Sequence, residues 1–160
     1  MIIPPYNRLP RVLWVGIGCQ RNTSPTLIEF AVTQILDKYK LQQKAIASLA
    51  TIDFKKDEIG IITLAKKWDL PLQTFSPEEL NTVSVPHRSQ IVKEEVGTTS
   101  VAEASALKAS LSSNLSENNL KSSHLIVPKH IIRQQGEKGT VTIAIAQLIN
   151  LRSNLFTESI

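Results

Sequence analysis

The amino-acid sequence predicts an α/β fold: a three-layer α/β/α sandwich around a mostly parallel, mixed sheet in a single domain. An apolar run over residues 11–16 has the pattern of a buried strand. It is followed by residues typical of a helix start and then by apolar residues at helical spacing over three turns. A second apolar run, residues 45–51, comes a few residues later. Parallel strands need a long crossover, usually a helix, so the two runs predict a βαβ unit. The 160 residues suit one domain with a sizeable core.

The first helix is predicted from its cap and from its apolar positions. Ser24 followed by Pro25 is typical of an N-cap and a first helical residue. Helical spacing is then kept by Leu27, Ile28, Ala31, Val32, Ile35, Leu36 and Tyr39. Because βαβ units place helices on the faces of a parallel sheet, we expect both faces to be covered.

The alternation of helix and strand continues after the second strand. Residues 57–68 have helical apolar spacing, and residues 71–75 predict a short third strand. At Ser76 a cap residue is followed by a proline and, three residues after the cap, by a glutamate. This pattern predicts a short helix that ends near Asn81.

Two further helices are predicted in the second half of the chain. Residues 89–96 predict a short helix closed by Gly97. Ser100 and Glu103 have the spacing of a second capping box, which opens an alanine-rich helix to about Ser110. In such a box the glutamate has a purely structural role.

The last part of the sequence predicts a polar excursion and two strands. Residues 110–123 are dominated by Ser, Asn and Lys, which indicates a surface excursion or a frayed helix end. Apolar runs at 125–127 and 140–149 flank a glycine-containing turn, so we expect a hairpin that makes the sheet mixed. The predicted organisation is an N-terminal tail, a domain and a C-terminal tail, at residues 1–10, 11–150 and 151–160.

The composition excludes several classes of protein. Hydrophobic residues make up 42% and charged residues 20%, which excludes a disordered polyelectrolyte. No apolar run approaches the roughly 18 residues that span a bilayer, and the N-terminus lacks the regions of a signal peptide. We therefore expect a cytoplasmic protein with no membrane partner. The single cysteine, Cys19, excludes an internal disulfide and a cysteine-based metal cluster, and the three histidines lack the spacing of a metal face.

The net charge of +4 favours an anionic partner. Aromatic residues are only 5%, and the sequence has no run of lysines and arginines interleaved with aromatics. These observations argue against a nucleic acid partner. A small polyanion suits the charge better.

The loop that joins the first strand to the first helix predicts an anion site. Glycines at 16 and 18 allow positive φ and let a ligand approach the backbone. Free amides at the start of the helix capped by Ser24 would favour a carboxylate or a phosphate. Arg21 adds a forked cation beside them.

Two other interpretations of this loop fit less well. The Gly-x-Gly pattern lacks the third glycine of a dinucleotide fingerprint, since residue 21 is arginine, and no Gly-Lys-Ser/Thr of a P-loop follows. Cys19 lies near a helix start and Arg21, where a nucleophilic thiolate is one interpretation. No base can be assigned to it from the sequence, so a packing thiol is favoured.

Charged residues gather just after the second predicted strand. Asp53, Lys55 and Glu58 follow its carboxyl end, which in a parallel sheet lies at the same edge as the loop after the first strand. We therefore expect them to join Arg21 around one crevice. The alternative is a solvated turn whose carboxylates stabilise a helix start.

A second loop, residues 97–100, is rich in glycine and hydroxyls and leads into a capped helix. It is another candidate for an anion at a helix terminus, with Thr98 and Ser100 as the donors. Two such loops could together bind a ligand that carries several acidic substituents.

Several ordered blocks of the sequence resemble one family. The first three are GIGCQRNTS at 16–24, TIDFKKDE at 51–58 and VGTTSVAEA at 96–104. Further blocks lie at residues 72–80, 125–129 and 140–146. In their order and spacing, across residues 12 to 147, they resemble the CbiG C-terminal domain and its free-standing relative CobE.

The resemblance implies a role in cobalamin biosynthesis, at the ring-contraction stage of corrin formation, on a three-layer α/β fold. Family members that contain this domain open the δ-lactone of cobalt-precorrin-5A and release acetaldehyde. The full-length hydrolase carries further domains before this one, so the chain would act as its C-terminal domain or as a partner subunit. Other cobalamin biosynthesis enzymes are further candidate partners. The resemblance implies no cofactor, because cobalt would arrive inside the substrate.

The implied ligand is an anionic tetrapyrrole rimmed by acetate and propionate carboxylates, which suits a basic domain. We expect Glu58 or Glu103 to be the general base of lactone opening. We expect substrate binding by Gly16, Gly18, Cys19, Arg21, Ser24, Lys55, Thr98, Ser100 and Lys129. Two alternatives stay open: a non-catalytic module that binds corrinoids and hands them between enzymes, and a phosphate- or nucleotide-binding α/β domain.

Overall fold

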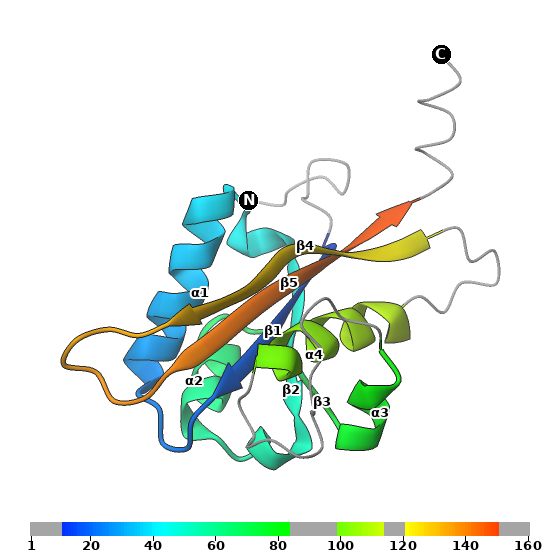
Figure 1. Ribbon diagram of the computed structural model, residues 1–160. Coiled ribbons are helices and arrows are strands. Elements are labelled where there is room, and N and C mark those ends of the chain that lie inside the picture. The colour runs from blue at the N-terminus through cyan, green and yellow to red at the C-terminus, as the bar shows by residue number, and fades with distance from the viewer. Residues whose placement is uncertain (1–10, 84–98, 114–120, 151–160) are drawn as a thin grey trace.

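The fold is built on one five-stranded mixed sheet (Figure 1). The structure is a computed structural model that describes residues 11–83, 99–113 and 121–150. The strands are β1 (Leu13–Cys19), β2 (Ile46–Ile52), β3 (Leu72–Phe75), β4 (Lys121–Ile132) and β5 (Val141–Asn150). The helices are α1 (Pro25–Tyr39), α2 (Ile59–Lys67), α3 (Pro77–Asn81) and α4 (Thr99–Ser112), with 3-10 turns η2 (Gln43–Ala45) and η3 (Asp53–Lys55).

The sheet has the strand order β3-β2-β1-β5-β4. β1 pairs parallel with β2, and β2 pairs parallel with β3. β5 lies antiparallel to β1, and β4 lies antiparallel to β5. The prediction of a mostly parallel sheet that ends mixed is therefore confirmed, with β1 at its centre.

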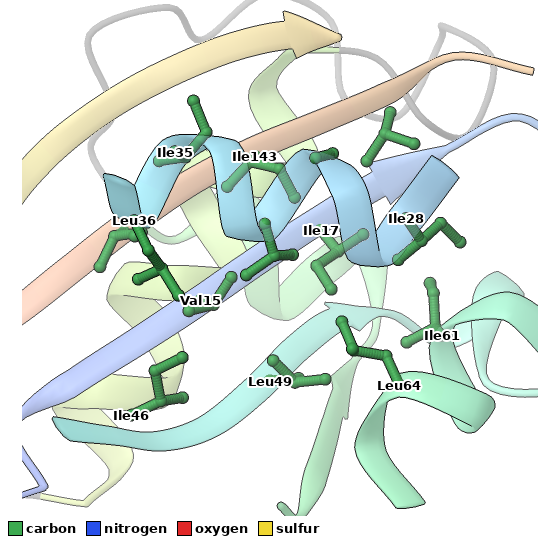
Figure 2. Packing of buried hydrophobic residues seen from close by; sticks show 14 of the residues in the cluster. Val15, Ile17, Ile28, Ile35, Leu36, Ile46, Leu49, Ile61, Leu64 and Ile143 are labelled. Atoms are coloured by element: carbon green, nitrogen blue, oxygen red, sulfur yellow. The ribbon is translucent and has the colours of Figure 1, made fainter. Parts of the chain in front are cut away.

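One face of the sheet is covered by α1 and α2. Ser24 caps α1 as predicted, because its hydroxyl accepts the amide of Leu27 at 3.3 Å and Pro25 is the first helical residue. The apolar face of α1 packs onto β1, β2 and β5, and α2 completes the layer (Figure 2). The labelled side chains are Val15, Ile17, Ile28, Ile35, Leu36, Ile46, Leu49, Ile61, Leu64 and Ile143.

The other face of the sheet is covered by α4 and α3. A second cluster of buried apolar residues joins Trp14 and Ala146 of the sheet to Ala106 and Leu107 of α4. The capping box of α3 is confirmed, since the Ser76 hydroxyl and the carboxylate of its partner glutamate each accept a backbone amide. Helices on both faces give the predicted three layers.

Gly16 has a different role from the predicted one. It lies inside β1, and a Cβ at this position would collide with the carbonyl of Ala102 and come within 2.9 Å of the amide nitrogen of Ala106. The missing side chain therefore makes room for α4, not for a ligand. Neither Gly16 nor Gly18 has positive φ; among the described glycines, those that do are Gly136 and Gly139.

Several predicted boundaries need correction. The first strand was expected at residues 11–16, but β1 runs to Cys19 because its pairing with β5 continues beyond the end of its pairing with β2, out to Val141. α4 begins one residue before Ser100, so that serine is not its N-cap.

The polar excursion is shorter than predicted. α4 continues to Ser112, β4 begins at Lys121, and the hydroxyls of Ser110 and Ser123 hydrogen-bond to each other. The rest of the excursion, the helix expected at 89–96 and both tails lie outside the described residues. In the part of the chain that is described, no helix is both long and apolar enough to cross a membrane.

Candidate functional site

The predicted site lies where β1 and β2 end. β1 ends at Cys19 and leads through a five-residue loop into α1, while β2 ends at Ile52 and leads through η3 to α2. Because β1 and β2 are parallel neighbours, both connections leave the same edge of the sheet. Of the residues expected to join Arg21 at this edge, Glu58 contacts it, and so does Asp57, while Asp53 and Lys55 make no ion pair with it. That these residues line one crevice stays a prediction.

Arg21 is the centre of an ion-pair cluster at this edge. Its Nη1 lies 2.9 Å from Oδ1 of Asp57 and 3.0 Å from Oε2 of Glu58. Its Nη2 donates to the carbonyl oxygen of Phe54. Hydrogen bonds and charge hold the pKa of the exposed Asp57 below its usual range. The arginine thus ties the loop after β1 to the start of α2.

The second oxygen of Glu58 holds the backbone of the same loop. Oε1 accepts the amide of Asn22 at 2.6 Å. Asn22 has φ of +60°, a left-handed conformation that asparagine tolerates better than most residues. Glu58 is only 3% exposed, and both of its oxygens are engaged within the fold. Sequence analysis missed this contact, although an asparagine in a tight loop was a signal for positive φ.

The hairpin between β4 and β5 packs against the loop that joins β1 to α1. The amide of Gln20 donates to Thr140, and the amide of Ser24 donates to Lys138. A Cβ at Gly139 would collide with Thr23, so the hairpin backbone lies directly against the loop. Thr23 itself donates both its amide and its hydroxyl to the carbonyl of Gln20.

The expectation of free amides at the start of α1 is corrected for two of them, because the amides of Leu27 and Ile28 donate to the hydroxyl and the carbonyl of Ser24. Most amides of the loop before the helix are also occupied. The amides of residues 20, 22, 23 and 24 all have acceptors within the fold. An anion at this edge would therefore rely on side-chain cations more than on backbone donors.

Lys55 is a cation that could bind an anion at the edge where β1 and β2 end. It is 2% exposed although it belongs to a turn, and it lies close enough to Cys19 for its charge to lower the pKa of that thiol. Among the described residues no carboxylate lies within ion-pair distance of its ammonium, and no side-chain hydrogen bond from it is present. Burying a charge without a partner is costly, so the Lys55 ammonium is suited to pair with an anion that reaches this edge.

Cys19 does not fit the profile of a nucleophile. Its side chain is buried, and burial raises the pKa of the thiol from 9.0 to about 11, although Lys55 opposes the shift. A thiol with this pKa is neutral at physiological pH and reacts poorly. The interpretation as a packing thiol is therefore favoured by the structure.

The raised pKa of Cys19 predicts a pH dependence of stability. The fold favours the neutral thiol, so its contribution is complete below pH 9 and is lost as the pH rises to about 11. The loss should reach at most about 3 kcal/mol. The free energy of unfolding is measured with urea for the wild type and for Cys19→Ala between pH 8 and 11. The difference between the two proteins at each pH gives the contribution of the thiol. Parallel curves for the two proteins would contradict the assignment.

Glu103 and Lys129 form a second group, on the α4 face of the sheet. Glu103 is fully buried in α4, and its Oε2 accepts the amide of Lys129 at 3.1 Å. The β4–β5 register slips between Val127 and His130, so this amide belongs to a bulge and turns away from β5. Glu103 thus accepts a hydrogen bond from the bulge of β4. Thr98 and the side chain of Ser100 lie outside the description.

A wide hollow of about 630 Å³ lies apart from the predicted residues, between residues 34–38 of α1 and 130–133 of β4. Beside it the Tyr39 hydroxyl and Nε2 of His130 are 2.7 Å apart. Burial and the charge of Lys38 lower the pKa of His130, which favours the neutral form of its ring. No group of three or more His, Cys, Asp or Glu side chains that could hold a metal occurs among the described residues.

Comparison with known proteins identifies the family. The family model described as "Cobalamin synthesis G C-terminus" matches residues 13–146. The chain belongs to this family. The assignment to cobalamin synthesis made from the sequence blocks is therefore confirmed at the level of the family.

Curated relatives are cobalt-precorrin-5A hydrolases. The protein of Priestia megaterium is 32% identical over 123 residues, which are 77% of this chain and 33% of the relative. The protein of Salmonella typhimurium is 29% identical over 147 residues, which are 90% of this chain and 37% of the relative. The chain thus spans about a third of the length of the hydrolases that it matches.

Solved structures of the family share the fold. CobE, described as a protein from the cobalamin (vitamin B12) biosynthetic pathway, superposes with a TM-score of 0.70 at 27% identity, covering 93% of this chain and 96% of that one. The cobalamin biosynthesis protein chiG from Agrobacterium tumefaciens has a TM-score of 0.59 at 27% identity, covering 85% and 98%. Both match this family domain over nearly their whole length.

Proposed function

We propose that this family domain binds a corrinoid intermediate of cobalamin synthesis as the C-terminal part of a cobalt-precorrin-5A hydrolase. The carboxylates of the substrate would be received at the edge where β1 and β2 end. The remaining two thirds of the hydrolase, on the same or another chain, would be its partner, and the cytoplasm its compartment. The substrate brings its own cobalt.

The buried ammonium of Lys55 carries the proposal. A carboxylate of the macrocycle entering this edge would supply the anion that the described residues do not. A charge-assisted hydrogen bond in such a sheltered place is stronger than one at the surface. Arg21, about half exposed, is already paired with Asp57 and Glu58, so we assign it the outer part of the site.

Glu58 and Glu103 suit a positioning role better than the predicted role of general base. Lactone opening needs a free carboxylate or another base to activate water, and donors for the developing oxyanion. Glu58 holds Arg21 and Asn22, and Glu103 holds the bulge of β4. Since the relatives are about three times longer, we propose that the base comes from the part of the hydrolase that this chain does not match.

Binding of cobyrinic acid, a corrinoid with seven free carboxylates, tests the site directly. We expect Lys55→Met to weaken the affinity measured by calorimetry at least about tenfold, the usual scale for a hydrogen bond to a charged group. Lys56→Met is the matched control, because Lys56 is the exposed neighbour with the same charge. Equal affinities of the two variants would remove Lys55 from the site.

A chimeric enzyme tests the reaction. This chain replaces the matching C-terminal part of the Salmonella typhimurium hydrolase, and acetaldehyde released from cobalt-precorrin-5A is measured. We expect release by the chimera and a loss of release when it carries Lys55→Met. A folded chimera that binds the substrate and releases nothing would contradict the catalytic proposal.

One observation favours a second candidate function. CobE is matched over 96% of its length, so a chain of this size is a complete structure in that case. A domain without the rest of a hydrolase would bind and hand over a corrinoid without converting it. The two candidates differ in the chimera assay, because only the first requires turnover.

A further inference from the structure

We propose that Phe54 and Ile59 form an apolar platform that receives one face of the corrinoid macrocycle beside its carboxylate site. The inference rests on the proposed function and adds the residues that would distinguish a macrocycle from a small polyanion. It assigns a role to side chains that the charged cluster leaves unexplained.

Large apolar side chains are exposed at few places in the described part of the chain. They are Phe30, Phe54, Ile59, Leu111 and Ile131. A single exposed apolar residue is common and needs no explanation. Two of the five, however, lie within the six residues 54–59, which also supply Lys55 and both carboxylates of the Arg21 cluster.

Local structure holds both side chains outward. Lys55 and Glu58 are anchored inside, at 2% and 3% exposure, while Phe54 and Ile59 next to them are 52% and 73% exposed. The carbonyl of Phe54 accepts Nη2 of Arg21, and Ile59 begins α2 directly after Glu58. Turning Phe54 inward would disturb the bond that its carbonyl accepts from Arg21 and the burial of Lys55, and turning Ile59 inward would disturb the bonds of Glu58.

The chemistry of the proposed ligand matches a surface on which apolar side chains lie beside charged ones. A corrinoid has a broad hydrocarbon face and a rim of carboxylates, so a site for it needs apolar area beside cations. Aromatic and aliphatic side chains gain free energy in proportion to the apolar area that the ligand covers. A phosphate or a small carboxylate would need the cations alone.

The test is the cobyrinic acid titration with paired double variants. Phe54→Ser with Ile59→Ser should weaken binding about tenfold or more, a loss that fits the area of two such side chains. Phe30→Ser with Ile131→Ser is the matched control, since it removes the same residue types from α1 and β4, and its affinity should stay within about twofold of the wild type. Phe54→Leu with Ile59→Val should largely restore binding. Thermal melts confirm that each variant is folded.

The outcomes separate the two proposals. If the double variant binds like its control while Lys55→Met has lost affinity, the platform is wrong and the carboxylate site stands. If the wild type does not bind cobyrinic acid at all, the proposed function fails and the platform fails with it. Loss in both double variants alike would also overturn the platform, because the effect would not be local.

Discussion

Gly16→Ala should destabilise the fold by roughly 3 kcal/mol or more, at the upper end of what overpacking a core costs. The added methyl group would collide with the backbone carbonyl of Ala102 and lie 2.9 Å from the amide nitrogen of Ala106. These are backbone atoms of α4, so they cannot move aside as a side chain can. The helix would have to lift from β1, and the apolar cluster beneath it would open.

Gly136→Ala is the control for this prediction. Gly136 has φ of +86° and no atom within 4 Å of an added Cβ, so only the conformational cost of about 1 kcal/mol applies. Urea unfolding of the two variants gives the comparison. Similar losses in both would show that α4 does not rest closely on Gly16 in solution.

Lys55→Met should have the opposite effect on stability while removing the proposed function. Methionine keeps the length of the side chain but needs no partner in a buried place. Removing an ammonium that is 2% exposed and has no carboxylate partner among the described residues should raise the free energy of unfolding by about 1 to 3 kcal/mol. Gains of stability at the expense of activity are expected where a site holds a costly charge.

The exposed neighbour again provides the control. Lys56→Met should change the free energy of unfolding by less than about 0.5 kcal/mol, as surface substitutions usually do. The measurement is the urea midpoint at constant slope, at pH 7 without ligand. A loss of stability in Lys55→Met would mean that the ammonium is satisfied within the fold, and the case for an anion at this edge would fall.

Local signals in the sequence were sufficient for most of the fold. The cap and apolar spacing of α1, the capping box of α3 and the short β3 all follow from a few neighbouring residues. Boundaries were less predictable where pairing partners are distant. β1 runs past Gly16 to Cys19 because β5, more than 120 residues later in the chain, continues to pair with it.

For the candidate site, the sequence by itself determined which connections share an edge of the sheet. Parallel neighbours β1 and β2 must send their connections to one edge, so the segments that hold Arg21 and Glu58 were expected near each other. Only the tertiary structure decided what each does there. Burial left the Lys55 ammonium without a partner among the described residues, and α4 occupies the space above Gly16 that a ligand was expected to use. Contacts of this kind depend on elements far apart in the chain, and no local pattern of residues encodes them.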